Sequence, residues 1–204
     1  MRHRFRFAIS HTTHDARRMF IYQTASLLLD VVAGLLGGAC LLRLYMQLQR
    51  VPFANPLGRF VIAVSNWLVL PLRRVFRAVG RFDVASALGG WLIVLAKTLL
   101  LWLLAGALDV SLAALAIVSV FGVLKLAVSG LMGLIIVHAV LSWVPNAASP
   151  MQYLLALLVE PVVRPVRRVV PAIGGIDLSP LVAIVALQIL NIALAAIEAR
   201  LLGL

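Results

Sequence analysis

Paired arginines are the residues of this 204-residue chain whose type and spacing best suit ligand binding. Arg73-Arg74 and Arg167-Arg168 each follow an apolar stretch that contains proline, and Arg164 stands shortly before the second pair. A guanidinium group can hold a phosphate through two parallel hydrogen bonds. We therefore expect these arginines to bind anionic lipid headgroups or an acidic partner protein. The alternative is that they only fix the topology of the chain in a membrane.

A second candidate is a pair of opposite charges within apolar segments. Asp30 lies in the segment 20–42 and Lys97 lies in the segment 84–108. An unpaired charge near the middle of a bilayer costs at least about 2.5–3.5 kcal/mol on insertion scales. If the two segments are neighbouring antiparallel helices, an ion pair between Asp30 and Lys97 removes that cost. The pair either orients the helices or forms an ion or proton path, and the lack of further polar residues favours the first role.

The other polar residues of the apolar segments favour structural roles. Asp83 and Asp177 precede apolar segments, where a carboxylate can cap free amide groups and meet the positive end of a helix dipole. His138 is the single histidine of the apolar part, which disfavours a haem or zinc site, and we expect it to be hydrogen-bonded to a backbone carbonyl or to a neighbouring helix. Asn191 predicts a hydrogen bond between helices. Because no catalytic constellation or phosphate-binding glycine loop accompanies them, we expect no enzyme activity, metal or cofactor.

Composition indicates which elements must position these residues. Hydrophobic residues make up 63% of the chain and charged residues 12%, and the mean hydropathy is +1.09. A soluble domain is about 45–50% apolar and about 25% charged. The net charge of +11 comes from basic residues between long apolar runs, so nucleic-acid binding is not expected. With the single cysteine Cys40, a disulfide scaffold is excluded as well. The chain is predicted to be an all-α integral membrane protein.

Four segments reach the length of about 20 apolar residues that a membrane-spanning helix needs. They are residues 20–42, 84–108, 126–144 and 178–202. The shorter run 110–124 is either an interfacial helix or the first half of a longer helix. One helix over 110–144 would be about 52 Å long, so we expect a break between Lys125 and Gly130. Glycines at positions 34, 37, 38, 89 and 90 are expected to permit close helix contacts.

Two shorter segments, 56–79 and 150–173, are amphipathic and contain Pro71, Pro161 and Pro165, which end or kink a helix. Their length predicts interfacial or re-entrant helices. A gapless shift of 94 residues matches nine of the 28 positions between Pro56 and Asp83. The sequence therefore predicts a parallel tandem repeat. Its parts are a basic tail (1–18), a first unit (19–108), a linker or interfacial helix (109–125) and a second unit (126–204).

The distribution of charge predicts the orientation of the chain. The link from Arg43 to Arg81 carries seven arginines and no acidic residue, whereas the link with Asp109 has no basic residue before Lys125. The positive-inside rule puts the arginine-rich links in the cytoplasm and both termini outside. The five arginines of residues 1–18 oppose this. One explanation is that the charges of the links outweigh those of the tail, and another is that segment 56–79 inserts more deeply into the membrane. A third is that translation starts at Met19 and residues 1–18 are not native. We favour the third.

The two copies carry residues of a recognisable motif. In the first copy these are Asn55-Pro56, Pro71-Leu72-Arg73-Arg74, Gly80 and Asp83. In the second copy they are Ser142-Trp143, Ser149-Pro150, Glu160-Pro161, Arg164-Pro165-Val166-Arg167-Arg168, Pro171 and Gly174-Gly175-Ile176-Asp177-Leu178-Ser179-Pro180. Through these residues the chain resembles the YggT family, also called YlmG, from about Met19 to Leu202. The first copy departs from the pattern where Leu70 replaces the arginine and Arg77 replaces the proline of the second copy.

The resemblance implies a multi-pass protein of the bacterial inner membrane, associated with osmotic tolerance or cell division, or with cytochrome assembly in plastid relatives. We expect a non-enzymatic scaffold or assembly factor that binds anionic lipid and membrane or cytoplasmic partner proteins. The alternative is an ion-handling protein that uses Asp30 and Lys97. Homo-oligomerisation stays open.

Overall fold

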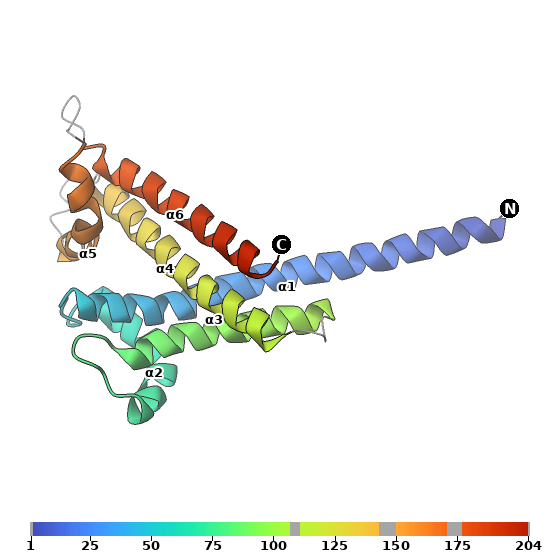
Figure 1. The fold of residues 1–204 in the computed structure, drawn as a ribbon, viewed down its shortest axis with the longest axis horizontal. Coiled ribbons are helices and arrows are strands. Elements are labelled where there is room, and N and C mark those ends of the chain that lie inside the picture. The colour runs from blue at the N-terminus through green and yellow to red at the C-terminus, as the bar shows by residue number, and fades with distance from the viewer. Residues whose placement is uncertain (1, 107–110, 143–149, 171–176, 204) are drawn as a thin grey trace.

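The protein is described from a computed structural model, which covers residues 2–106, 111–142, 150–170 and 177–203, with side chains from residue 19 onward. These ranges form six helices and no strand (Figure 1). The helices are α1 (Arg2–Leu48), α2 (Pro56–Val75), α3 (Val84–Ala105), α4 (Leu112–Ser142), α5 (Pro150–Arg167) and α6 (Ser179–Leu201). The predicted all-α fold class is confirmed. The predictions that concern Asp109, Trp143, Pro171 and Gly174-Gly175 lie outside the described residues.

Four helices are long and apolar enough to cross a membrane, as predicted. They are Met19–Leu48 within α1, and α3, α4 and α6. Large apolar side chains on these helices face outward, for example Leu28, Leu103, Val140 and Ile189. A bilayer supplies the apolar surroundings that such a surface needs. The two shorter helices α2 and α5 are not among the candidate spans.

The break expected between Lys125 and Gly130 is wrong, because α4 runs without interruption from Leu112 to Ser142. Residues 112–124 are therefore the first half of a long helix, which was one of the two predicted alternatives. No proline interrupts α4, and an isolated glycine costs a helix only about 1 kcal/mol relative to alanine. At 1.5 Å per residue the 31-residue helix is about 46 Å long, and tilting accommodates such a length in a bilayer.

The short helices begin at the predicted residues 56 and 150, but they end four and six residues before the predicted segments 56–79 and 150–173 do. Asn55 is the N-cap of α2, and its side chain accepts a hydrogen bond of 2.7 Å from the amide of Gly58. Pro56 occupies the first turn, where its missing amide hydrogen costs nothing. The prolines do not end the helices at once: α2 continues four residues beyond Pro71, and α5 continues two residues beyond Pro165.

Both short helices lie at the same end of the long helices (Figure 1). A core of Met46, Val51 and Val61 from the first repeat and Leu154 and Leu158 from α5 joins them across the repeats. The Tyr45 hydroxyl adds a hydrogen bond of 2.8 Å to the Leu158 carbonyl oxygen. The N-terminal part of α1 extends past the other helices at the opposite end (Figure 1). This arrangement agrees with the predicted parallel repeat.

Close contact between α1 and α3 depends on some of the predicted glycines. A Cβ atom at Gly37 would lie 3.7 Å from the Gly90 carbonyl oxygen, and one at Gly90 would lie 3.1 Å from the Leu41 side chain. At Gly34 or Gly38 a Cβ atom would meet nothing within 4 Å. The prediction of close packing is therefore wrong for these two glycines.

Candidate functional site

Each repeat holds an arginine–aspartate ion pair between its short helix and the start of the next long helix. In the first repeat, Nη2 of Arg73 donates to Oδ2 of Asp83. In the second, Nε of Arg167 donates to Oδ2 of Asp177 at 3.0 Å. The partners are related by the same shift of 94 residues, so both copies form the same contact. Two of the five predicted ligand-binding arginines thus have a partner within the fold.

Asp83 is the more deeply placed of the two aspartates, with a side chain that is 0% exposed. It is the N-cap of α3, where its carboxylate accepts hydrogen bonds from the backbone amide of Ser86 at 3.4 Å and from the Ser86 hydroxyl at 2.6 Å. Burial alone would raise the pKa of Asp83, but the hydrogen bonds from Arg73 and Ser86 outweigh burial and hold the pKa below its usual range. Asp83 therefore stays ionised at neutral pH.

Asp177 occupies the corresponding place in a more open setting. Its Oδ1 accepts a hydrogen bond of 2.9 Å from the amide of Ser179. Hydrogen bonding by Ser179, from its side chain first and its backbone second, lowers the pKa of Asp177. The N-cap of α6 is Leu178, so Asp177 binds the helix start from one residue further out. Arg167 also donates through Nη1 to Oε2 of Glu160 at 3.1 Å. The second pair is therefore a three-residue ion network at the surface.

The other predicted ligand-binding arginines have a different environment. Arg74, Arg164 and Arg168 are exposed, and none of them forms an ion pair with a described residue. They lie in or directly beside the last turns of α2 and α5, next to the exposed apolar residues Val75 and Val169. Three cations beside apolar surface suit a membrane interface or an acidic partner.

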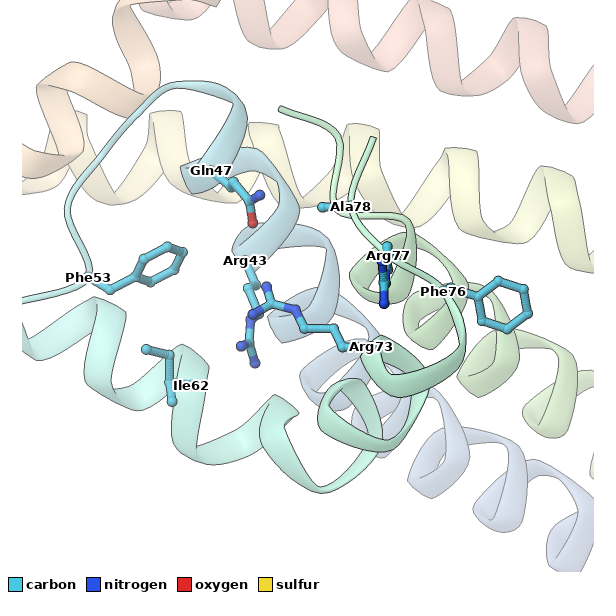
Figure 2. A pocket seen from close by; sticks show the side chains of 8 residues that line it. All are labelled: Arg43, Gln47, Phe53, Ile62, Arg73, Phe76, Arg77 and Ala78. Carbon is cyan, nitrogen blue, oxygen red and sulfur yellow. The ribbon is translucent and has the colours of Figure 1, made fainter. Parts of the chain in front are cut away.

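Two further arginines, which the sequence did not single out, complete a basic cavity in the first repeat. The cavity has a volume of about 450 Å³ and is lined by Arg43, Arg73 and Arg77 together with Gln47 and apolar side chains (Figure 2). Arg43 is 5% exposed, and its Nη1 donates to Ser65 Oγ at 2.9 Å and Asn66 Oδ1 at 2.8 Å. The sequence predicts that the first span ends at Leu42, which assigns Arg43 to the following link. In the structure α1 continues to Leu48, so Arg43 lies on the helix.

The structure brings Asp30 and Lys97 together within the long helices. Nζ of Lys97 lies 2.6 Å from Oδ1 of Asp30 and joins α3 to α1. The pair borders a cavity of about 410 Å³, which is also lined by Thr98, Lys125 and Ser129. Polar residues therefore do continue beyond the pair, contrary to the expectation from the sequence.

A second ion pair in the long helices was missed. Nζ of Lys125 in α4 donates to Oε2 of Glu198 in α6, and the side chain of Glu198 is 11% exposed. The sequence does contain two opposite charges in apolar segments, which could have indicated this pair. Because a helix break is expected from Lys125 onward, the sequence prediction places Lys125 outside the spans. The predicted hydrogen bond of Asn191 is found: its Nδ2 donates to Ser129 Oγ at 3.1 Å. The expectation that His138 is hydrogen-bonded does not hold for its Nδ1 atom, which is buried without a partner.

Comparison with known proteins identifies the chain's relatives. The CCB3/YggT family model matches two segments, residues 22–104 and 117–197, and the second of them begins within the predicted linker 109–125. An uncharacterized protein in the proC 3′ region of Vibrio alginolyticus is 36% identical over 152 residues, which cover 74% of this chain and 82% of the relative. The uncharacterized protein YggT of Escherichia coli K12 is 34% identical over 174 residues, which cover 84% of this chain and 89% of the relative.

No solved structure matches the chain. The family model covers most of the chain. Arg73 and Asp83 lie within its first matched segment, and Arg167 and Asp177 lie within the second. Four apolar helices in the described part of the chain, two segments matched by the family model and similarity to a YggT protein over 84% of the chain lead to one assignment. The chain is a membrane protein that belongs to the CCB3/YggT family.

Proposed function

We propose that this protein is a non-enzymatic scaffold or assembly factor that binds anionic lipid and an acidic partner protein through the ends of α2 and α5. The observation that carries the proposal is the exposed, unpaired state of Arg74, Arg164 and Arg168 among the described residues. A guanidinium group without a counter-ion in the fold is available to a phosphate or carboxylate. Arg73 and Arg167 hold the short helices in place so that these cations face outward.

The proposal places the end that carries α2 and α5 in the cytoplasm. Its support is the charge of the link from Arg43 to Arg81, which has seven arginines and no acidic residue. In a bacterium this membrane is the inner membrane, whose anionic lipids attract each nearby Lys or Arg by about 1 kcal/mol. The arginine-rich residues 1–18 then lie outside, where the positive-inside rule disfavours them.

The test is recovery of partner proteins after crosslinking in native membranes. The triple variant Arg74→Glu, Arg164→Glu, Arg168→Glu is compared with Arg200→Glu, a charge reversal in the last turn of α6. We expect the triple variant to insert normally and to lose partners that the wild type and Arg200→Glu both recover. An unchanged set of partners from correctly inserted triple variant contradicts the proposal.

A second candidate function is ion handling through the long helices. The specific observation in its favour is the cavity of about 410 Å³ that contains Asp30, Lys97 and Lys125. Charged residues within a membrane often mark an ion or proton path. The candidate predicts ion flux in reconstituted vesicles that Asp30→Asn abolishes. The absence of ion flux over a wide range of ionic conditions would contradict this second candidate function.

A further inference from the structure

The basic cavity of the first repeat lies between the end of α1, α2 and the link to α3 (Figure 2). Figure 2 shows the side chains of Arg43 and Arg73 pointing toward one another, with Phe53 and Ile62 on the facing wall. Its volume of about 450 Å³ lies within the range of small-molecule sites. The cavity therefore combines cationic groups with an apolar wall.

The positive charge of this cavity is not neutralised by the fold. The acidic partner of its lining arginines among the described residues is Asp83, which binds Arg73. Arg43 is buried, yet the two side chains that accept its hydrogen bonds, Ser65 and Asn66, are uncharged. Buried charges are normally paired, and two neighbouring guanidinium groups repel one another. An anion in the cavity would supply the missing counter-charge.

An unpartnered donor at the same place also points to a ligand. Nε of Arg73 is buried and has no hydrogen-bond partner, although Nη2 of the same side chain binds Asp83. Arg77, which also lines the cavity, forms no ion pair with a described residue. A phosphate accepts several hydrogen bonds from guanidinium groups at once.

Comparison of the repeats separates the residues that the fold needs from those that are additional. The ion pair of Arg73 and Asp83 recurs in the second copy, as described above. The positions that correspond to Arg43 and Arg77, by contrast, are Val137 and Pro171. The second copy therefore keeps the structural pair without the other two arginines of the basic cavity.

We infer that Arg43, Arg73 and Arg77 form a binding site for the phosphate of one anionic phospholipid, which is present in the first repeat only. Arg43 lies five residues before the end of α1 at Leu48. With this end of the helix at the membrane surface, as proposed above, the cavity has the depth of a lipid headgroup. Basic pockets between transmembrane helices are known to take such headgroups. The apolar wall of Phe53, Ile62 and Phe76 suits the glycerol and the first methylene groups of the lipid.

This inference deepens the proposed lipid binding but depends on different residues, so the two can fail separately. The probe is phosphatidylglycerol, added to the delipidated protein in detergent and compared with phosphatidylcholine of the same chains. Native mass spectrometry counts the bound lipid, and the variants are Arg43→Gln, Arg77→Gln and the control Arg200→Gln, which changes an exposed arginine of α6 away from the cavity. Because Arg77 is exposed, Arg77→Gln is expected to fold even if Arg43→Gln does not.

We expect one tightly bound phosphatidylglycerol, with affinity about ten- to hundredfold weaker in Arg43→Gln or Arg77→Gln and unchanged in the control. Equal binding of phosphatidylcholine, or unchanged binding by folded Arg77→Gln, overturns the inference. Displacement of the lipid by millimolar inorganic phosphate also overturns it, because the site would then take free phosphate. If the triple variant loses its partner proteins but still binds phosphatidylglycerol, the lipid site is supported. If Arg43→Gln and Arg77→Gln do not weaken lipid binding but the triple variant loses its partners, the proposed scaffold is supported without the lipid site.

Discussion

At the scale of single residues, the adjacent arginines of α2 differ in role although they share one sequence motif. Arg73 binds the fully buried carboxylate of Asp83, whereas Arg74 is exposed and unpaired among the described residues. We expect Arg73→Gln to lower the free energy of unfolding by about 1.5–3 kcal/mol, because it removes a charged hydrogen bond from a buried carboxylate. Arg74→Gln serves as the matched control and should change stability by less than about 0.5 kcal/mol.

Thermal unfolding of the two purified variants measures this difference. Equal stability of Arg73→Gln and Arg74→Gln would show that the ion pair with Asp83 does not stabilise the fold.

The same aspartate makes stability depend on pH. Since the pKa of Asp83 is lowered in the fold, its stabilising contribution is complete above the ordinary value of 3.8 and is lost as the pH falls through the lowered value. We expect the wild type to lose its stability advantage over Asp83→Asn as the pH falls below about 3.8. Unfolding of both proteins between pH 7 and pH 2.5 measures this, and a constant difference over that range contradicts it.

At the scale of elements, the continuity of α4 has a direct test in two glycines. A Cβ atom at Gly130 would meet nothing within 4 Å, whereas one at Gly122 would lie 2.7 Å from Cγ1 of Val94 in α3. We expect Gly130→Ala to raise stability by up to about 1 kcal/mol, because alanine favours a continuous helix. Gly122→Ala should lower stability, since helix α3 must shift. Thermal unfolding in lipid distinguishes them, and destabilisation by Gly130→Ala would indicate a break in α4.

The contact between α4 and α6 has its own prediction through Lys125 and Glu198. Removal of one charge leaves the other unpaired in the membrane, so we expect Lys125→Met to cost about 2.5–3.5 kcal/mol. The double variant Lys125→Met, Glu198→Gln should recover most of this loss. Unfolding of the two single variants and the double variant forms the thermodynamic cycle, and strictly additive losses would show that the two charges do not interact.

The elements that the sequence predicted correctly are those that local pattern determines. Apolar length marks the four long helices, and Asp83 marks a helix start by capping. The basic cavity could not be predicted in this way. Arg43 meets Ser65 and Asn66 across more than twenty residues of chain, and the direction of its side chain follows from how α1 packs against α2.

At the scale of the whole molecule, the two repeats are alike in architecture and unlike in chemistry. Both hold an arginine–aspartate pair at the same end of the long helices. Only the first has arginines at the positions of Arg43 and Arg77. The basic cavity proposed above as a lipid site thus depends on two arginines that the second copy replaces with Val137 and Pro171.

The central claim is that α2 and α5 rest on the same face of the membrane, and cysteine labelling tests it most directly. Val75 and Val169 are repeat-equivalent and 74% and 81% exposed, and Leu112, at the other end of α4, is 84% exposed. Each is changed to cysteine in a Cys40→Ala background and labelled in sealed vesicles with an impermeant maleimide. We predict that Val75→Cys and Val169→Cys react from one side and Leu112→Cys reacts from the other. Labelling of Val75→Cys and Val169→Cys from opposite sides would contradict the account.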